Sequence, residues 1–175
     1  SGWSQEAVEA LAVRGILLGK GDGLFDPQGT VTRAEFTAMI ARLLSLEPAG
    51  EAIPFEDVTD DAWYAKELAA AHEAGIVLGK PDGTFGGDEP ITRQEMAVLL
   101  YRAAVQLIRS QAGGEEGIFA DASQIASYAQ DAVSALAAAG IINGLPDGTF
   151  GPEQTATREQ AAAMLWRLLQ IVLGG

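Results

Sequence analysis

The chain repeats one pattern three times, and this repeat constrains its fold more than any local feature. In each copy a Thr-Arg-x-Glu/Gln tetrapeptide follows a turn of the form Asp-Gly-x-Phe. The tetrapeptides are Thr32-Arg33-Ala34-Glu35, Thr92-Arg93-Gln94-Glu95 and Thr157-Arg158-Glu159-Gln160, and the turns begin at Asp22, Asp82 and Asp147. A single copy of about 60 residues is marginally stable alone, so we expect the three copies to share one core.

The sequence of each copy predicts a helix, a glycine-rich turn and a second helix. The expected helices cover residues 4–14, 32–46, 61–74, 92–110, 125–139 and 157–173, where good helix formers and apolar residues recur with a 3.6-residue period. A Gly-Ile pair after each first helix, at Gly15, Gly75 and Gly140, is typical of a left-handed C-cap. We therefore expect an all-α fold of three helix-turn-helix repeats in a pseudo-threefold arrangement around a central helical bundle.

The repeat also divides the chain. We expect copies at residues 1–46, 55–110 and 119–173, joined by linkers of turn composition into one structural unit. Copies two and three open with a Phe-x-Asp segment, at Phe55 and Phe119, in which Asp57 and Asp121 are candidate helix caps or loop anchors. Copy one lacks this lead-in, and we expect the natural chain to extend further toward the N-terminus.

Composition excludes several functions. The 175 residues carry a net charge of -13, which is unfavourable for binding nucleic acid. The chain has no cysteine, so it has no disulfide and no thiolate site, as suits a protein outside the reducing cytosol. Its apolar runs are too short to insert in a membrane.

The tetrapeptides predict capping boxes, in which the Thr side chain and a Glu or Gln three residues later bind each other's main-chain amide. The residues concerned are Thr32 with Glu35, Thr92 with Glu95, and Thr157 with Gln160. Capping does not explain the arginine, because a cation in the first helical turn opposes the helix dipole. Arg33, Arg93 and Arg158 can pair with a carboxylate of a neighbouring copy or bind an external anion beside the helix amides, and the two roles are not exclusive.

The glycine-rich loops have a structural interpretation with one exception. Asp22, Asp82 and Asp147 suit tight turns. Lysines at Lys20 and Lys80 are not required by a turn, so they are candidates for a second cation; copy three has Leu145 there. The loops lack the ligand spacing of an EF-hand, and we expect no metal and no cofactor.

Aromatic residues recur near the start of each first helix. Trp3, Trp63 and Tyr128 are either core residues or platforms on which a sugar ring can stack. The single histidine, His72, lies in one copy only, and no nucleophile-and-base group repeats with the units. We therefore expect no catalytic residues and no enzyme activity in this chain.

The ordered series Phe-x-Asp, aromatic, Gly-Ile, Asp-Gly-x-Phe and Thr-Arg-x-Glu resembles the S-layer homology domain, which usually occurs in threes. The resemblance implies a pseudo-trimeric anchor on the bacterial cell surface, secreted and without membrane insertion, that binds a secondary cell wall polymer. It implies a terminal pyruvylated N-acetylmannosamine as the ligand, held in grooves between repeats by Arg33, Arg93 and Arg158. Because copy three has Gln160 and Leu145 in place of Glu and Lys, the grooves need not be equivalent, and we expect one or two working sites around Arg33 and Arg93.

A second hypothesis remains open, in which the chain is a self-assembly module of an S-layer and does not bind a glycan directly. Under the anchoring hypothesis, an Arg93→Glu substitution should abolish wall binding with little loss of fold. Under the assembly hypothesis it should lower the melting temperature instead. Either module can belong to a longer parent chain that carries a cargo domain.

Overall fold

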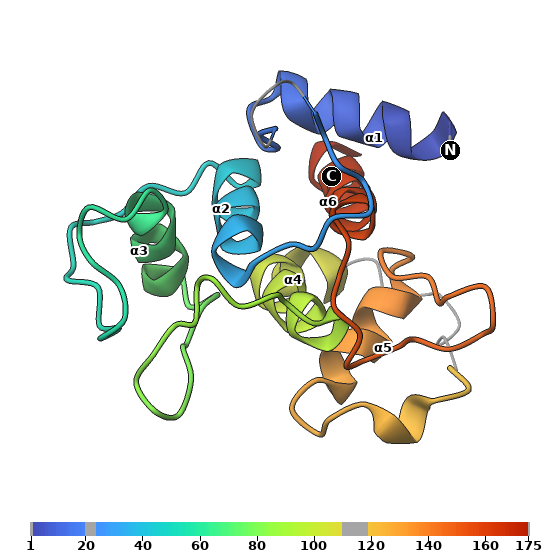
Figure 1. The fold of residues 1–175 in the computed structure, drawn as a ribbon. Coiled ribbons are helices and arrows are strands. Elements are labelled where there is room, and N and C mark those ends of the chain that lie inside the picture. The colour runs from blue at the N-terminus through green and yellow to red at the C-terminus, as the bar shows by residue number, and fades with distance from the viewer. Residues whose placement is uncertain (1, 20–23, 110–118, 175) are drawn as a thin grey trace.

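The computed structural model describes residues 2–19, 24–109 and 119–174, without the side chains of residues 2–4, 106 and 109. Within these ranges the ordered elements are helices: α1 (Gly2–Val13), α2 (Arg33–Leu43), α3 (Ala65–Glu73), α4 (Arg93–Arg109), the 3₁₀ turn η1 (Ala122–Gln124), α5 (Gln130–Ala138) and α6 (Arg158–Gly174). Isolated bridges take the place of strands in the described ranges (Figure 1). The predicted all-α class is confirmed.

The second helix of each copy begins one residue after its threonine, as the capping boxes predict. The end of α2 is earlier than the expected residue 46, because Ser45 takes a left-handed conformation with φ of 52°. The amide of Leu46 then donates to the carbonyl of Ala41, and the amide of Ser45 to that of Arg42, which closes the helix after Leu43.

The first helices end within one residue of the prediction; α1 begins earlier than expected, at Gly2, and α3 and α5 begin later. Gly15, Gly75 and Gly140 have φ near 70°, and the Ile after each donates its amide to a carbonyl five residues back, as in a Schellman motif. However, α3 starts at 65 rather than 61 and α5 at 130 rather than 125. The preceding residues form tight turns with bonds to the third residue back, such as Ala62 to Thr59 and Ala129 to Ala126. The aromatic residues Trp63 and Tyr128 therefore precede the helices.

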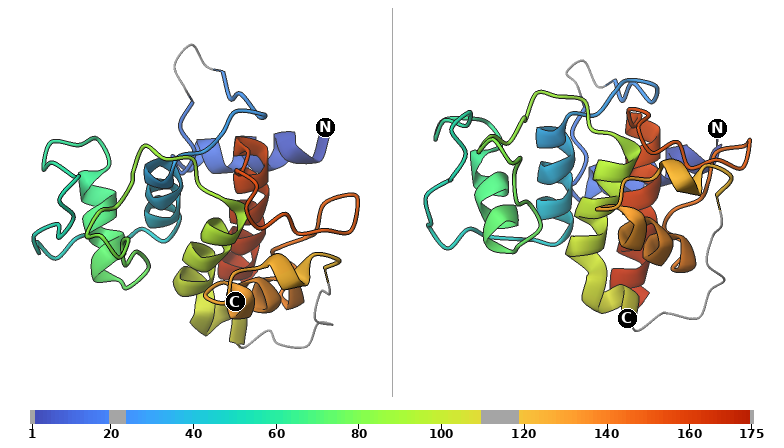
Figure 2. Two further views of the ribbon diagram at one scale, coloured as in Figure 1. Left: turned by 60° about the horizontal axis from the view of Figure 1, so that its bottom comes forward. Right: turned by 90° about the horizontal axis from the view of Figure 1, so that it is seen from below.

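The helices pack between copies rather than within them. The second helices α2, α4 and α6 contact one another at the centre, and each carries one outer helix (Figures 1 and 2). Here α3 packs on α2, α5 packs on α4, and α1 packs on α6, so each first helix lies against the second helix of the preceding copy. Since α1 and α6 come from opposite ends of the chain, this contact joins copy three to copy one and closes the contacts between copies into a ring.

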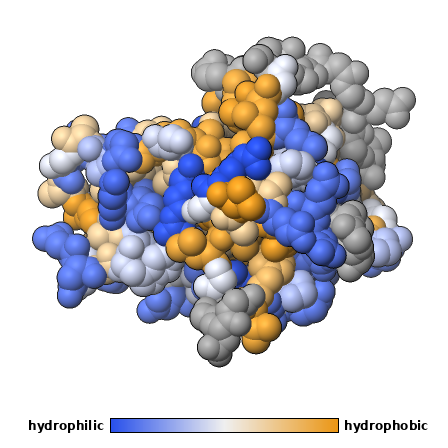
Figure 3. All heavy atoms as spheres, turned by 90° about the horizontal axis from the view of Figure 1, so that it is seen from above, coloured by the Kyte–Doolittle hydropathy of each residue, from blue (hydrophilic) through white to orange (hydrophobic). Residues whose placement is uncertain are grey.

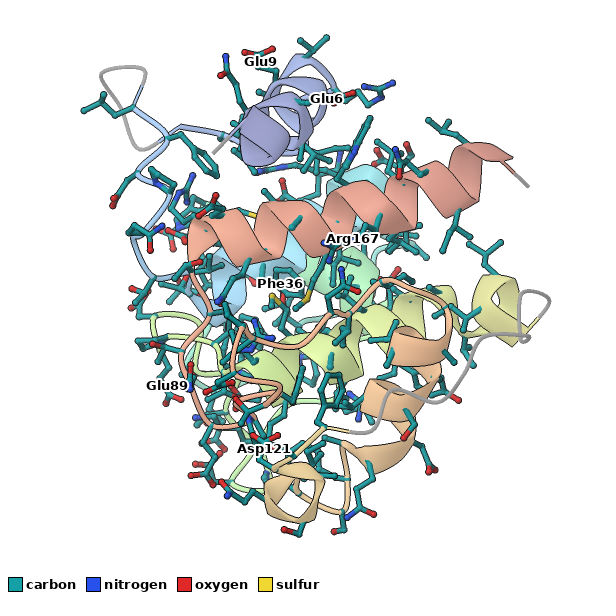
Figure 4. The ribbon with its side chains drawn as sticks, turned by 90° about the vertical axis from the view of Figure 1, so that its right-hand side faces the viewer. Glu6, Glu9, Phe36, Glu89, Asp121 and Arg167 are labelled. Atoms are coloured by element: carbon teal, nitrogen blue, oxygen red, sulfur yellow. The ribbon has the colours of Figure 1, made fainter. Side chains whose placement is uncertain are left out.

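Main-chain hydrogen bonds close the same ring. The amide of Ile91 donates to Val31, that of Ala156 to Ile91, and that of Val31 to Ala156, over 2.9, 2.9 and 3.2 Å. All three residues are fully buried, next to the core that holds Phe36 (Figure 4). The contacts follow the cyclic order that a pseudo-threefold arrangement requires. The symmetry itself stays a prediction, as do the copy boundaries at 1–46, 55–110 and 119–173.

Candidate ligand-binding site

Each arginine of the tetrapeptides reaches across a copy border to the Asp-Gly-x-Phe turn of the next copy. Its Nε atom donates to the main-chain carbonyl of the phenylalanine, and its guanidinium lies over that phenylalanine's ring. The pairs are Arg33 with Phe85 (3.0 Å to the carbonyl, 5.6 Å to the ring centroid), Arg93 with Phe150 (2.7 and 5.0 Å) and Arg158 with Phe25 (2.7 and 5.3 Å). The arginines are buried, with only 9, 2 and 2 % of their surface exposed.

The three predicted capping boxes position these arginines. Each Thr hydroxyl accepts the amide three residues later, at 3.1 to 3.3 Å, and each Glu or Gln side chain accepts the Thr amide in return, at 2.8 to 3.2 Å. Because the arginine follows the capping threonine directly, the cap fixes the main chain from which the arginine side chain extends. The capping residue three positions on then faces the arginine of the preceding copy.

The lead-in aspartates hold the turn from its other side. Asp57 accepts the amides of Phe85 and Gly86 at 2.7 and 2.8 Å, and Asp121 accepts the equivalent amides of copy three. Partial burial raises the pKa of Asp57, but these two amide bonds lower it more, so the pKa lies below its ordinary value. Of the two expected roles, cap or anchor, the structure shows the loop anchor.

Two of the three arginines have a carboxylate partner. Arg33 Nη1 lies 3.3 Å from Glu95 Oε1, and Arg158 Nη1 lies 3.6 Å from Glu35 Oε2. The corresponding partner of Arg93 is the uncharged Gln160. Among the described residues, no carboxylate oxygen lies within 4.0 Å of Arg93.

Arg158 lines a cavity of about 240 Å³ between the copies. Its other walls include Glu35, Met39 and Arg42 of copy one and Trp63 of copy two. Trp63 is 59 % exposed, so of the two alternatives for this residue the core alternative does not hold. The cavity thus combines two guanidinium groups with an accessible indole face.

Tyr128 occupies the equivalent position of copy three and is also exposed, at 61 %. The pKa of its phenol is raised, first by local desolvation and then by the charge of Glu95, while Arg33 opposes the rise. Tyr128 therefore lies near the Arg33–Glu95 pair. The side chain of Trp3 is outside the described residues.

A second cavity, of about 260 Å³, contains Arg93. It is lined by Arg93 of copy two together with the loop 143–146, Gln160, Ala163, Met164 and Arg167 of copy three. Arg167 donates from Nη1 to the carbonyl of Ile141, and burial lowers the pKa of its guanidinium. Figure 4 shows Arg167 leaving α6 on the side turned away from α1.

Arg42 and Arg167 were not among the predicted ligand residues, although each lines a cavity. The sequence feature that could have identified Arg42 and Arg167 is that they occupy equivalent positions in different copies. Eight of the 11 cations fall at equivalent positions of the copies: Lys20 and Lys80; Arg33, Arg93 and Arg158; Arg42, Arg102 and Arg167. The third member of the last set, Arg102, donates to the carbonyl of Ile76.

The candidate loop residues that the structure describes each bind a partner in their own copy. Asp82 and Asp147 each accept the amide and hydroxyl of a threonine two residues later, which fixes the turn. Lys80 pairs with Glu89 of its own copy. Lys20 and Asp22 lie outside the described residues. The structure thus brings Arg93 and Arg158, but not Lys80, to the two cavities.

Three further observations concern the surface, metal-binding side chains and the described helices. Seen from above, strongly hydrophilic and hydrophobic side chains adjoin near the middle of that face (Figure 3). Over the described ranges, no group of three potential metal-binding side chains is found. None of the described helices has the length and apolar character needed to cross a bilayer.

Comparison with known proteins gives consistent relatives. The chain is 40 % identical over 172 residues to an amylopullulanase of Thermoanaerobacterium thermosulfurigenes, 34 % identical over 160 residues to a cellulosome-anchoring protein of Acetivibrio thermocellus, and 32 % identical over 175 residues to a surface-layer 125 kDa protein of Lysinibacillus sphaericus. These alignments cover 96, 89 and 98 % of this chain but only 9, 35 and 14 % of the relatives. The chain therefore spans a small part of their length.

A family model accounts for the shared part. The model described as the S-layer homology domain matches residues 1–37, 54–97 and 118–162. Each match includes one border-crossing arginine and ends within the helix that this arginine begins. This chain belongs to the S-layer homology domain family and carries three copies of the domain.

Proposed function

We propose that the chain anchors a larger protein non-covalently to the bacterial cell wall by binding an acidic secondary cell wall polysaccharide in grooves between its copies. The location is the cell envelope, on the outer surface. Relatives described as a cellulosome-anchoring protein and as surface-layer proteins support both parts of the proposal. The enzymes among the relatives, such as the amylopullulanase, are much longer than this chain and support a cargo domain elsewhere in a parent protein.

The Arg158 cavity carries the proposal. Two guanidinium groups, of Arg42 and Arg158, line it together with the exposed indole of Trp63. A guanidinium recognises a carboxylate, and an aromatic face suits the apolar C–H face of a sugar ring. A pyruvylated N-acetylmannosamine presents both groups, since its ketal-linked pyruvate is ionised at neutral pH.

The net charge of -13 does not prevent this binding. Exposed charges more than about 10 Å away are largely screened at physiological salt, whereas buried guanidinium groups act directly on a bound anion. The ligand residues we propose are Arg33, Arg93, Arg158, Trp63 and Tyr128. Lys20, Lys80 and Trp3 remain candidates at equivalent register.

Calorimetric titration tests the ligand. The chain is titrated with the methyl glycoside of pyruvylated N-acetylmannosamine and, separately, with the same sugar without pyruvate. We expect heat of binding with the first sugar only. Equal binding of both sugars would contradict recognition of the carboxylate, and binding of neither would exclude this sugar as the ligand.

The self-assembly function has one observation in its favour. The Arg33–Glu95 and Arg158–Glu35 pairs tie neighbouring copies of the same chain together. These ties lie within one molecule, and assembly requires contacts between molecules. Light scattering of the isolated chain over a concentration series separates the functions, because an assembly module forms higher oligomers without any glycan.

A further inference from the structure

The three border-crossing arginines differ in how far their charge is satisfied. Arg158 donates from Nη2 to the carbonyl of Leu18 at 2.9 Å and pairs with Glu35, and Arg33 pairs with Glu95. Arg93 donates from Nε alone, and its two Nη groups have no hydrogen-bond partner among the described residues. It is nevertheless only 2 % exposed. A buried guanidinium without a carboxylate partner is costly, and burial lowers the pKa of Arg93 although the charge of Asp121 opposes that change.

The cavity in front of Arg93 contains nothing that would neutralise it. Its lining holds two arginines, Arg93 and Arg167, and no aspartate or glutamate. Two acids of copy three bind other groups: Asp147 binds Thr149, and Asp121 binds the amides of Phe150 and Gly151. In contrast, the matching cavity of Arg158 includes Glu35. The Arg93 cavity is thus cationic and lacks a carboxylate of its own.

One residue accounts for this difference. Gln160 occupies the position of Glu35 and Glu95, and its Oε1 atom fulfils the same capping bond to the Thr157 amide at 3.2 Å. The cap does not need a charge there, since Gln serves as well as Glu. The change from Glu to Gln therefore leaves the fold intact and removes the internal carboxylate that would otherwise occupy the arginine.

We propose that the groove formed by Arg93, Arg167 and Gln160 is the preferred site for a sugar-linked carboxylate, and that Gln160 is the residue that determines this preference. The inference rests on the proposed glycan binding and adds which groove binds and why. In the grooves of Arg33 and Arg158 the ligand carboxylate must displace Glu95 or Glu35. In the Arg93 groove it meets an unpaired guanidinium, and the neutral Gln160 does not repel it.

Gln160→Glu tests the inference. The new glutamate keeps the capping bond and can pair with Arg93, as Glu95 does with Arg33, so the melting temperature should be unchanged or higher. Affinity for the methyl glycoside of pyruvylated N-acetylmannosamine should fall about ten- to a hundredfold, as expected for the loss of a charge-assisted hydrogen bond. The matched control is Gln124→Glu, which adds the same charge at an exposed residue outside this cavity and should leave the affinity unchanged.

A second readout separates this inference from the identity of the glycan. Sodium pyruvate is titrated into the ¹⁵N-arginine-labelled chain, and the side-chain Nε–Hε signals are assigned by substitution. We expect pyruvate to shift the Arg93 signal in the wild-type chain but not in the Gln160→Glu variant. If the glycoside does not bind while pyruvate shifts Arg93, the proposed sugar is wrong and the groove assignment stands. The assignment is overturned if Arg93 does not respond to pyruvate, or if both proteins bind the glycoside equally.

Discussion

The Nε atom of Arg93 lies 2.7 Å from the carbonyl oxygen of Phe150 and donates a hydrogen bond to it across the border between copies two and three. On the other side of the same residue, Asp121 accepts the Phe150 amide, also at 2.7 Å. The turn of copy three is therefore held by its own lead-in and by its neighbour's arginine. The arginines thus bind neighbouring copies, which is one of the two roles that the sequence left open, and their binding of an external anion stays a proposal.

Arg93→Ala should lower the free energy of unfolding by about 1–3 kcal/mol, because the Phe150 carbonyl loses a charge-assisted partner. Urea unfolding at pH 7 measures the loss. The control is Arg14→Ala, whose arginine binds the carbonyl of Ala10 on the surface and should contribute little. Equal stabilities of the two variants would show that the border-crossing bond does not stabilise the fold.

The burial of Arg93 also changes the experiment that the sequence suggested. An Arg93→Glu variant would put a carboxylate next to the Phe150 carbonyl, so we now expect loss of stability together with any loss of binding. That variant cannot separate anchoring from assembly. Substitutions at residue 160 or 35, which keep the cap, are the informative ones.

Glu35→Gln should create a second free arginine site. The amide can keep the capping bond to Thr32, as Gln160 does to Thr157, while Arg158 loses its carboxylate partner. We expect tighter binding of pyruvylated N-acetylmannosamine glycoside and a stoichiometry that rises from one toward two. The gain is limited because Arg158 keeps its bond to Leu18.

Glu6→Gln is the matched control for this prediction. Glu6 lies on α1 and points into solvent (Figure 4), so its loss changes net charge by the same amount without freeing an arginine. An equal gain in binding for both variants would indicate a general effect of net charge. The prediction would then be wrong.

Trp63→Ala, made in the Glu35→Gln background, should weaken the glycoside binding gained at the Arg158 cavity, with little effect on stability. Trp63 is mostly exposed and contacts Tyr64 edge-on at 5.2 Å between ring centroids. Loss of an aromatic contact corresponds to about a three- to tenfold change in affinity. Calorimetry of Trp63→Ala is compared with Leu173→Ala, an exposed apolar residue outside the cavity, and identical affinities would exclude stacking by Trp63.

Local signals were sufficient for the parts of this fold that local contacts decide. The spacing of Thr32 and Glu35 predicts the capping box, and the Gly15-Ile16 pair predicts the helix end, because each motif satisfies its own amides and carbonyls. The predicted start of α3 at residue 61 is wrong, because α3 begins at Ala65. Of residues 61–64 only Ala62 is a strong helix former, and tight turns with bonds from Ala62 to Thr59 and from Ala65 to Ala62 occupy this segment instead.

Contacts between copies could not be predicted from one copy. Nothing near Arg93 in sequence indicates that its guanidinium is buried against Phe150, 57 residues away. Gln160 was noted as a departure from Glu, but its consequence requires knowing that residue 160 faces Arg93. The partner of Lys80 was missed for a different reason, since Glu89 belongs to the same copy and reaches Lys80 only through the folded loop.

Leu11→Ala should destabilise a helix that lies at the opposite end of the chain. Leu11 is fully buried on α1, and α1 packs on α6. We expect a loss of about 2–5 kcal/mol, as for other buried leucines, and faster hydrogen exchange in α6. Val13→Ala, in the same helix but 87 % exposed, is the control. Unchanged exchange in α6 would contradict the closed ring of contacts.

Stability should fall in acid because Asp57 is held as a carboxylate by the amides of Phe85 and Gly86. Its pKa in the folded chain lies below the ordinary value of 3.8, so the unfolded chain takes up the proton first as the pH falls. The stabilisation is complete above about pH 4 and is lost as the pH falls through the folded pKa. Asp82 and Asp147, whose pKa values are lowered by bonds from Thr84 and Thr149, act in the same direction.

Asp57→Asn isolates the contribution of one carboxylate to this pH dependence. Because Asp57 is exposed, solvent screening keeps its share modest. In urea unfolding we expect the variant to be less stable at pH 7 and to lose less stability than the wild-type chain between pH 5 and 3. The range from pH 7 to 5, where both curves should be flat, is the internal control. Parallel curves below pH 5 would show that the anchor at Phe85 does not depend on ionised Asp57.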